Sequence, residues 1–409
     1  MGTLRILLGA IGTLFFGVEP NRRFAASRLD GLGTSKIRAG SAQVATKFEL
    51  IDLASGAPAF STPDLLKAQA VEAIQGDHNQ YADPAGDREL RALIAAEAHR
   101  TSNEVTITAG TSAALAGLLF AIVEKDDEVI VFSPFFESYS SAIRLAGATP
   151  RYVALTATEW TIDEAALRAA FNKRTKAVII NTPHNPTGRV LSKQELELVA
   201  RLCEENGCFL ISDEIYSKLV FENATAEPAS APSLTETVWN RSRNIVIDGL
   251  SKAHNATGWR VGYVIAPQAV TDLFRIVHSV MGLSAPTPLQ IAARSAFHQD
   301  VLADLSKTVF ACQAARNLLC EALQAAGFAL RVPDGATYVF ADASQLGAES
   351  TDAARDLLIN KTGIKSVSGD CFFDETEQAP QGQWLRFCFA RDIGLIQKAA
   401  ERLRLLTSN

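Results

Sequence analysis

The chain has 409 residues, of which 47% are hydrophobic, so it can bury a large core that we expect to divide into two lobes. Its formal net charge is −6 and its pI is about 5.6, and without a long basic run it is not expected to bind nucleic acid. Six cysteines show neither a CxxC spacing nor a Cys/His metal pattern, which is typical of buried thiols in a reducing compartment.

The N-terminal stretch MGTLRILLGAIGTLFFGVEP combines one basic residue with an apolar run that is too short to span a membrane. The pattern resembles the start of a signal peptide, but no clean A-x-A cleavage site follows it. An arm that packs on the protein body is the alternative. We therefore leave residues 1–27 unassigned and expect a cytoplasmic protein without a stable membrane span, while export or organelle targeting stays open.

Short β-rich runs then alternate with helical patterns along the chain. The runs lie at 104–109, 128–132, 151–155, 177–183, 209–214, 244–250 and 262–267. Several of them are apolar without alternation, as expected for strands that are buried on both faces. The order predicts an α/β fold in which a mainly parallel, seven-stranded sheet is covered by helices, with a smaller α+β domain beside it.

Polar and aromatic residues follow most of these runs, at the point where each strand is expected to end. In parallel sheets, ligands bind beyond the carboxyl ends of the strands, so we expect these side chains to gather at one edge. They are Gly110, Thr111 and Ser112 after the first run, Phe136 after the second, Asn185 after the fourth, Asp213 and Tyr216 at the fifth, and Ser251 and Lys252 after the sixth.

Together these groups suit pyridoxal 5′-phosphate, which carries a phosphate, a ring nitrogen, a phenolic oxygen and an aldehyde. Lys252 is expected to form the Schiff base with the aldehyde. Asp213 is expected to face the ring nitrogen and keep it protonated, so that the ring can stabilise a carbanion. Asn185 and Tyr216 would hydrogen-bond the phenolic oxygen, and Phe136 would stack on the ring.

The phosphate of such a cofactor needs donors of its own. The helix that opens at 110–112 offers amides and hydroxyls at its N-terminus, and Arg260 would clamp the phosphate. Gly258 and Gly262 would let the backbone bend so that Arg260 reaches back past Lys252. Each feature alone has an ordinary explanation, such as a helix cap or a solvated lysine, and the combination in this order favours the cofactor.

The segments NTPHNPTG, SDEIY and LSKAHNATGWRVGY resemble the signatures of fold-type I pyridoxal-phosphate enzymes, and more narrowly of the class I/II aminotransferases of the aspartate aminotransferase superfamily. The resemblance covers roughly residues 28–405. It implies a homodimer in which Tyr81 reaches the phosphate site of the neighbouring subunit. It also implies substrate binding by Gly56, Asn185 and Arg386, where Arg386 takes the α-carboxylate.

The chain departs from the family at Gly249, where some relatives carry a hydroxyl that serves as a phosphate donor. Ser251 or a water molecule is expected to take its place. The large cofactor-binding domain is expected at 61–295 and the small domain at 28–60 plus 296–409. The small domain's sheet is expected to begin near Tyr338.

The resemblance implies transamination, in which an amino group moves from an L-amino acid to a 2-oxo acid. Another reaction on the same scaffold, namely β- or γ-elimination, cyclisation or oxidation of an amino acid, is the alternative. Relatives that prefer aspartate often carry a second cation for the distal carboxylate of the substrate, either at the position of Ser112 or in the stretch HSVMGLSAPTPLQ. Neither place holds a lysine or an arginine in this chain. The expected pocket walls favour a neutral or aromatic substrate side chain; they are Ile37, Phe136, Tyr139, Tyr338 and Phe372.

Overall fold

The computed structural model of the protein describes residues 26–29, 32, 33, 35, 37, 46–221, 231–377 and 381–407. Its largest sheet has seven strands in the order β2-β8-β7-β6-β5-β3-β4. Of these, β8 runs antiparallel to both of its neighbours, and the other six share one direction. The strands are β2 (Val105–Thr108), β3 (Glu128–Ser133), β4 (Thr149–Ala154), β5 (Thr175–Asn181), β6 (Phe209–Asp213), β7 (Asn244–Gly249) and β8 (Gly262–Ile265).

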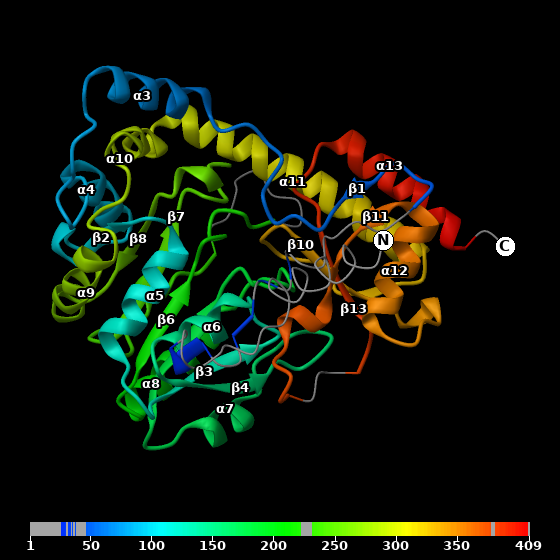
Figure 1. Ribbon diagram of the computed structural model, residues 1–409, viewed down its shortest axis with the longest axis horizontal. Coiled ribbons are helices and arrows are strands. Elements are labelled where there is room, and N and C mark those ends of the chain that lie inside the picture. The colour runs from blue at the N-terminus through cyan, green and yellow to red at the C-terminus, as the bar shows by residue number, and fades with distance from the viewer. Residues whose placement is uncertain are drawn as a thin grey trace, which may run out of the picture.

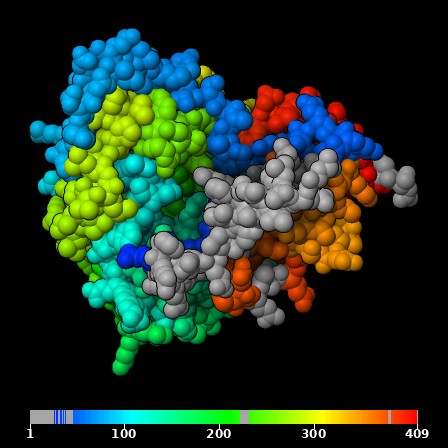
Figure 2. All heavy atoms as spheres, in the orientation of Figure 1, coloured from blue at the N-terminus to red at the C-terminus, as the bar shows by residue number. Residues whose placement is uncertain are grey.

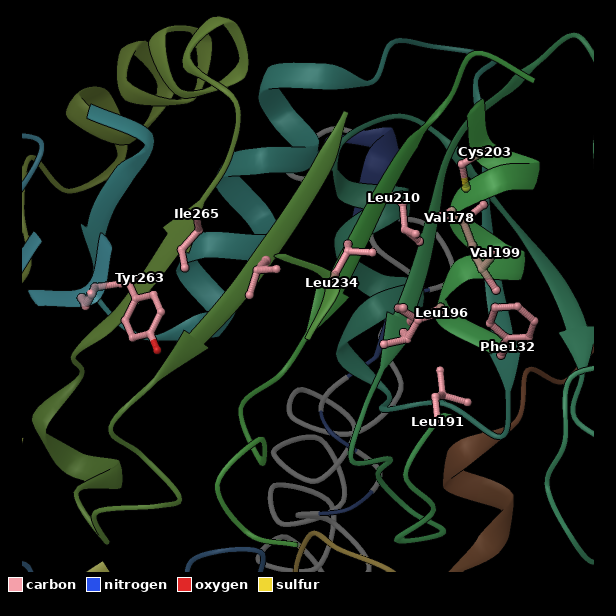
Figure 3. Close-up of a cluster of buried hydrophobic side chains, with 14 of the residues drawn as sticks. Phe132, Val178, Leu191, Leu196, Val199, Cys203, Leu210, Leu234, Tyr263 and Ile265 are labelled. Carbon is pink, nitrogen blue, oxygen red and sulfur yellow. The ribbon is translucent and has the colours of Figure 1, made fainter. Parts of the chain in front are cut away.

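The inner strands are buried on both faces because their side chains alternate between two apolar clusters. In β3, Val129 and Val131 pack under α5 (Thr111–Ile122), α6 (Ser138–Leu145) and α9 (Gln268–Met281). Ile130 and Phe132 point to the opposite face, which α7 (Glu164–Ala170) and α8 (Lys193–Glu205) cover. Figure 3 shows part of this second cluster, where Leu196, Val199 and Cys203 lie beside Val178 and Leu210.

Helix α8 shows how the sequence fixes a local boundary. Ser192 accepts a hydrogen bond from the backbone of Glu195, and the Glu195 carboxylate accepts one from the Ser192 backbone, which forms a capping box. The apolar side chains of α8 then recur on one face and pack on the sheet. The helix therefore begins at Lys193, directly after its cap at Ser192.

A second group of elements, here called the C-terminal unit, lies beside the large sheet and is yellow to red in Figure 1, apart from β1, which is blue. Its four-stranded sheet has the order β12-β13-β10-β9, and β1 pairs with β11 in a separate two-stranded sheet. Its helices pack on these strands in one apolar cluster. The elements are α11 (Gln299–Ala325), α12 (Thr351–Thr362), α13 (Ile393–Leu403), β9 (Ala329–Leu330), β10 (Tyr338–Asp342), β11 (Ile364–Lys365), β12 (Val367–Ser368) and β13 (Trp384–Cys388), with β1 (Ile51–Asp52) contributed by the N-terminal part.

Three further helices complete the described fold: α3 (Asp64–Gln75), α4 (Arg88–Glu97) and α10 (Thr287–Ala293), with α10 packed on α3. The predicted α/β fold is confirmed, and every predicted strand is found within a few residues of its expected bounds. Apart from residues 26 and 27, the unassigned segment 1–27 lies outside the described residues. Within the described ranges, no helix is long and apolar enough to cross a membrane.

Candidate active site

The carboxyl ends of the parallel strands meet at one edge of the large sheet, and the chain returns to that edge at the start of β8. Strand β6 ends at Asp213, and β7 ends shortly before Lys252. Because β8 is antiparallel, its amino end lies at the same edge, which brings Arg260 beside the end of β2. The strand order therefore brings Asp213, Lys252 and Arg260, which the sequence analysis assigned to one cofactor, to the same edge of the sheet.

Lys252 lies where the large sheet meets the strip of residues 52–57 that leaves β1. Its Nζ donates a hydrogen bond of 2.9 Å to the carbonyl of Gly56 and lies 5.7 Å from the centre of the Tyr216 ring. The Tyr338 hydroxyl is bonded to the Tyr216 hydroxyl at 3.0 Å and approaches the same Gly56 carbonyl. A Cβ at Gly56 would lie only 2.6 Å from the Tyr338 hydroxyl, so the close approach requires glycine.

Asp213 is held by Tyr139, whose hydroxyl donates to Asp213 Oδ2 at 2.7 Å. Burial raises the pKa of Asp213 to about 6, even though the Tyr139 hydrogen bond and the charge of Lys252 favour the carboxylate. Burial, together with the neighbouring Asp213 charge, also raises the pKa of Tyr139 well above its usual range. Because burial makes the ionised form of Asp213 unfavourable, this carboxylate is suited to face a cationic group. The sequence analysis named Tyr139 only as a pocket wall and missed its bond to Asp213.

Gly110 and Arg260 form a tight cradle at the start of α5. The Arg260 guanidinium donates to the carbonyls of Ala109 and Thr257. A Cβ on Gly110 would lie 2.2 Å from Arg260 Nη2, and Gly110 has φ +85°. Arg260 stays exposed, so its remaining donors and the first amides of α5 can serve an anion such as a phosphate. The donor set therefore fits the phosphate group.

The prediction for the glycines around Arg260 was wrong in detail. Neither Gly258 nor Gly262 adopts a positive φ; the reversal occurs at Arg260 itself, which has φ +53° and ψ +49°. Gly262 is required for a different reason, because a Cβ there would lie 2.8 Å from the Gly110 backbone. Ser251 is buried beside this region, whereas Thr111 is half-buried and Ser112 is exposed at the start of α5.

Arg386 is almost fully buried on β13, with 2% of its surface exposed. Its guanidinium donates to Asn185 Oδ1 at 3.0 Å and to the Ala54 carbonyl at 3.1 Å, while its Nε has no partner. It lies 4.2 Å from the centre of the Tyr338 ring and 5.0 Å from that of Phe372. Among the described residues no carboxylate pairs with Arg386. A buried cation without a counter-charge is costly, and it is suited to bind an anionic ligand.

Arg391 is a second buried arginine, and the sequence analysis did not identify it. It donates to the backbone carbonyls of Asp52, Ser55 and Ala57, at 3.0, 2.5 and 2.8 Å, and so holds the 52–57 strip against the end of β13. These partners lie more than 330 residues earlier in the chain. No local pattern in the sequence could have indicated the contact.

The two aromatic side chains after β3 divide between core and site. Phe135 is buried and stacks on Tyr152, with ring centres 5.1 Å apart. Phe136 is half-buried, and its ring lies nearly perpendicular to that of Tyr139. Tyr81 is not part of the cluster: 87% of its surface is exposed. In the described parts of the chain no group of His, Cys, Asp and Glu has the arrangement of a metal site.

The family described as "Aminotransferase class I and II" matches residues 49–403. Human kynurenine–oxoglutarate transaminase 1 is 28% identical over 94% of this chain and 98% of its own length. The aspartate/prephenate aminotransferase of Thermus thermophilus is 35% identical, over 87% and 90%. An Escherichia coli structure reported with a methionine aminotransferase function aligns with a TM-score of 0.85 and 28% identity, over 93% of this chain and 99% of that one.

These matches extend over nearly the whole chain, and the fold agrees with them. The chain therefore belongs to the class I and II aminotransferase family. It is a transferase that moves an amino group to a 2-oxo acid, as predicted.

Proposed function

We propose that the protein is a pyridoxal 5′-phosphate-dependent aminotransferase that acts on neutral or aromatic L-amino acids. One observation carries the proposal: an amine, a carboxylate of raised pKa and an arginine–glycine cradle share one edge of the sheet. These groups match the aldehyde, the ring nitrogen and the phosphate of the cofactor. When bound, the cofactor supplies an aldehyde that captures the amino group and a protonated ring that delocalises negative charge from the α-carbon.

The chain's own residues bind and orient this group. Gly110 and Arg260 hold the phosphate, helped by Thr111, Ser112 and Ser251. Asp213, kept in place by Tyr139, keeps the ring nitrogen protonated. Asn185 and Tyr216 bond the phenolic oxygen, and Phe136 covers one ring face.

Lys252 has two roles in the proposed reaction. It anchors the cofactor between turnovers, and its freed Nζ takes the α-proton of the substrate and returns it at the end of the half-reaction. The Gly56 carbonyl, 2.9 Å from Nζ, holds the amine at the edge of the site while it is not covalently engaged. The chain thereby keeps one proton carrier next to the reacting carbon.

Arg386 recognises the α-carboxylate, with Asn185 and the Gly56 amide beside it. Both substrates of a transaminase carry this carboxylate, so one buried arginine can serve the amino acid and the 2-oxo acid in turn. The bond from Arg386 to Asn185 orients the guanidinium before substrate arrives. The unpartnered Nε and the lack of a described counter-charge are in keeping with this role.

The substrate side chain is expected to meet apolar and aromatic walls. Tyr139, Tyr338 and Phe372 are buried at the site, and Ile37 and Phe136 are partly buried beside the core. Arg144, the cation of α6, is paired with Asp374. A distal carboxylate would thus lack a free partner among these residues, whereas an apolar side chain would gain about 1.5–3 kcal/mol from burial.

We propose that the active unit is a cytoplasmic homodimer. Exposed apolar side chains gather on α3 and α9, which form one end of the molecule in Figure 2; they are Val71, Ile74, Leu273, Ile276 and Val280, with exposed fractions of 50% to 85%. Tyr81, in the segment between α3 and α4, is also exposed, and we expect a second copy that covers this end to receive Tyr81 at its phosphate cradle. All six cysteines are free thiols, in keeping with a reducing compartment.

The test is to follow the amino group. Holoenzyme mixed with a ¹⁵N-labelled neutral amino acid and 2-oxoglutarate should yield ¹⁵N-glutamate and one equivalent of the donor's 2-oxo acid. Release of ammonia without any 2-oxo acid acceptor would favour the alternative of elimination or oxidation. Omitting the acceptor from a matched reaction is the control, because transamination then stops after one turnover.

A further inference from the structure

We propose that Asp374 is a positioning residue that fastens the β12–β13 connection onto the large sheet and so sets the affinity for both substrates. The connection comprises η7 (Gly369–Phe372) and the turn that follows it. It carries Phe372 against Arg386. The inference rests on the proposed role of Arg386 in carboxylate binding.

The Asp374 carboxylate joins two parts of the fold that are far apart in the sequence. Its Oδ2 accepts a hydrogen bond of 2.7 Å from the Tyr152 hydroxyl on β4 and one of 3.0 Å from Arg144 Nη2 on α6. Its Oδ1 accepts from the backbone and hydroxyl of Thr376, at 3.1 and 2.7 Å. Four donors on one carboxylate define its position tightly.

The β12–β13 connection makes a second set of contacts with the large sheet. The Phe135 amide donates to the Phe372 carbonyl at 2.8 Å, and Phe135 stacks on Tyr152. Glu377 accepts a hydrogen bond of 3.0 Å from the Asp374 amide, which closes the turn. The connection is therefore bonded to β4, to α6 and to the segment after β3.

These contacts reach the site through Phe372 and α6. Phe372 is fully buried, packs edge-on against Phe340 and places its ring 5.0 Å from the Arg386 guanidinium. Helix α6 carries Arg144 and also Tyr139, which holds Asp213. If the connection moved away from α6, Phe372 would leave Arg386 and open the carboxylate site to water, which would weaken its attraction for an anion.

The charge on Asp374 is permanent at working pH. Burial opposes ionisation, but the bonds from Thr376 and Tyr152 and the charge of Arg144 outweigh it and lower the pKa of Asp374 to about 2. Burial, with the bond to Asp374, raises the pKa of Tyr152 to about 12, so its hydroxyl keeps its proton. The hydrogen bonds of Asp374 with Tyr152 and Arg144 are thus independent of pH across the neutral range.

The experiment compares Asp374→Asn with wild type as holoenzymes. An amide has only one acceptor oxygen, so its NH2 group would face either Arg144 and Tyr152 or Thr376, and two of the four donors would lose their acceptor. We expect KM for the amino acid and for the 2-oxo acid to rise about tenfold each, the effect of losing one hydrogen bond to a charged group, with kcat within about threefold. Cofactor affinity should change less than the two KM values, because Asp374 contacts none of the proposed cofactor-binding residues directly.

Two further variants separate positioning from general destabilisation. Arg144→Gln combined with Asp374→Asn should be no worse than Asp374→Asn alone, because both remove the same interaction. Asp352→Asn, which breaks the ion pair between the exposed Asp352 carboxylate and the partly buried Arg355 on α12, is the matched control and should leave both KM values unchanged.

Three results would overturn the proposal: KM values of Asp374→Asn within twofold of wild type, a loss confined to kcat, or an equal rise in the Asp352→Asn control. Wild-type holoenzyme that does not transaminate would instead overturn the proposed function. The two failures are distinguishable, because only the second appears in the unaltered chain.

Discussion

Asp213→Asn should stabilise the cofactor-free protein at neutral pH and destabilise it relative to wild type once the cofactor is bound. The asparagine keeps an acceptor for the Tyr139 hydroxyl but removes a buried charge. Burial raises the pKa of Asp213 to about 6. A shift of about two units corresponds to about 3 kcal/mol of unfavourable free energy for the ionised form in the folded chain.

The pH dependence follows from the direction of that shift. The pKa of Asp213 is higher in the folded chain than in the unfolded chain, where it is about 4. The folded state therefore binds more protons between about pH 4 and pH 6, and the contribution of this group to stability falls as pH rises through that window. Above about pH 6 the whole cost is present in wild type and absent in Asp213→Asn.

The assay is urea unfolding of both cofactor-free proteins at pH 4.5 and pH 8, with and without pyridoxal 5′-phosphate. The gap in the free energy of unfolding should be small at pH 4.5 and approach 3 kcal/mol in favour of the variant at pH 8. Asp300→Asn, whose side chain is 81% exposed, is the control and should show no such gap. A difference in the free energy of unfolding that does not depend on pH would refute the assignment of Asp213 to a cationic partner. An equal increase in the free energy of unfolding of both proteins when the cofactor binds would refute it as well.

Three further predictions test other parts of the site. Gly110→Ala should weaken the cofactor by at least tenfold in equilibrium dialysis, because its Cβ would overlap Arg260 Nη2 at 2.2 Å; unchanged affinity would remove Arg260 from the phosphate site. Wild type should sediment as a dimer, and Tyr81→Phe should lower cofactor affinity without dissociating that dimer; a fully active monomer would exclude a shared site. In single-turnover reactions methionine, glutamine or phenylalanine should have a higher specificity constant than aspartate; the reverse order would reveal a cation near the pocket that the paired Arg144 does not supply.

The sequence was sufficient to predict the edge of the sheet where the site lies. Asn185, Asp213 and Lys252 each follow an apolar run, and parallel strands bring such positions together whatever the details of packing. Arg386 was also predictable, because an arginine within an apolar strand implies a buried anion partner. The contacts of its guanidinium with the rings of Tyr338 and Phe372 were not predictable from the sequence.

What the sequence could not supply are contacts between side chains that only tertiary packing brings together. Tyr139 reaches Asp213 because α6 lies on the sheet in one particular rotation. Arg391 reaches the 52–57 strip because β1 and the end of β13 become neighbours. Asp374 meets Tyr152 across 222 residues. None of these pairs has a local period or spacing, so the sequence pattern contains no signal for them.

The attachment of the cofactor to Lys252 can be measured most directly by borohydride reduction of the holoenzyme followed by peptide mapping. The reduced cofactor should be found on the peptide that contains Lys252 and on no other. Lys252→Ala should lose the absorbance of the bound cofactor and nearly all turnover, while it still folds, because Lys252 Nζ makes one hydrogen bond, to the Gly56 carbonyl. A reduced cofactor on another lysine, such as Lys218, would contradict the site described above.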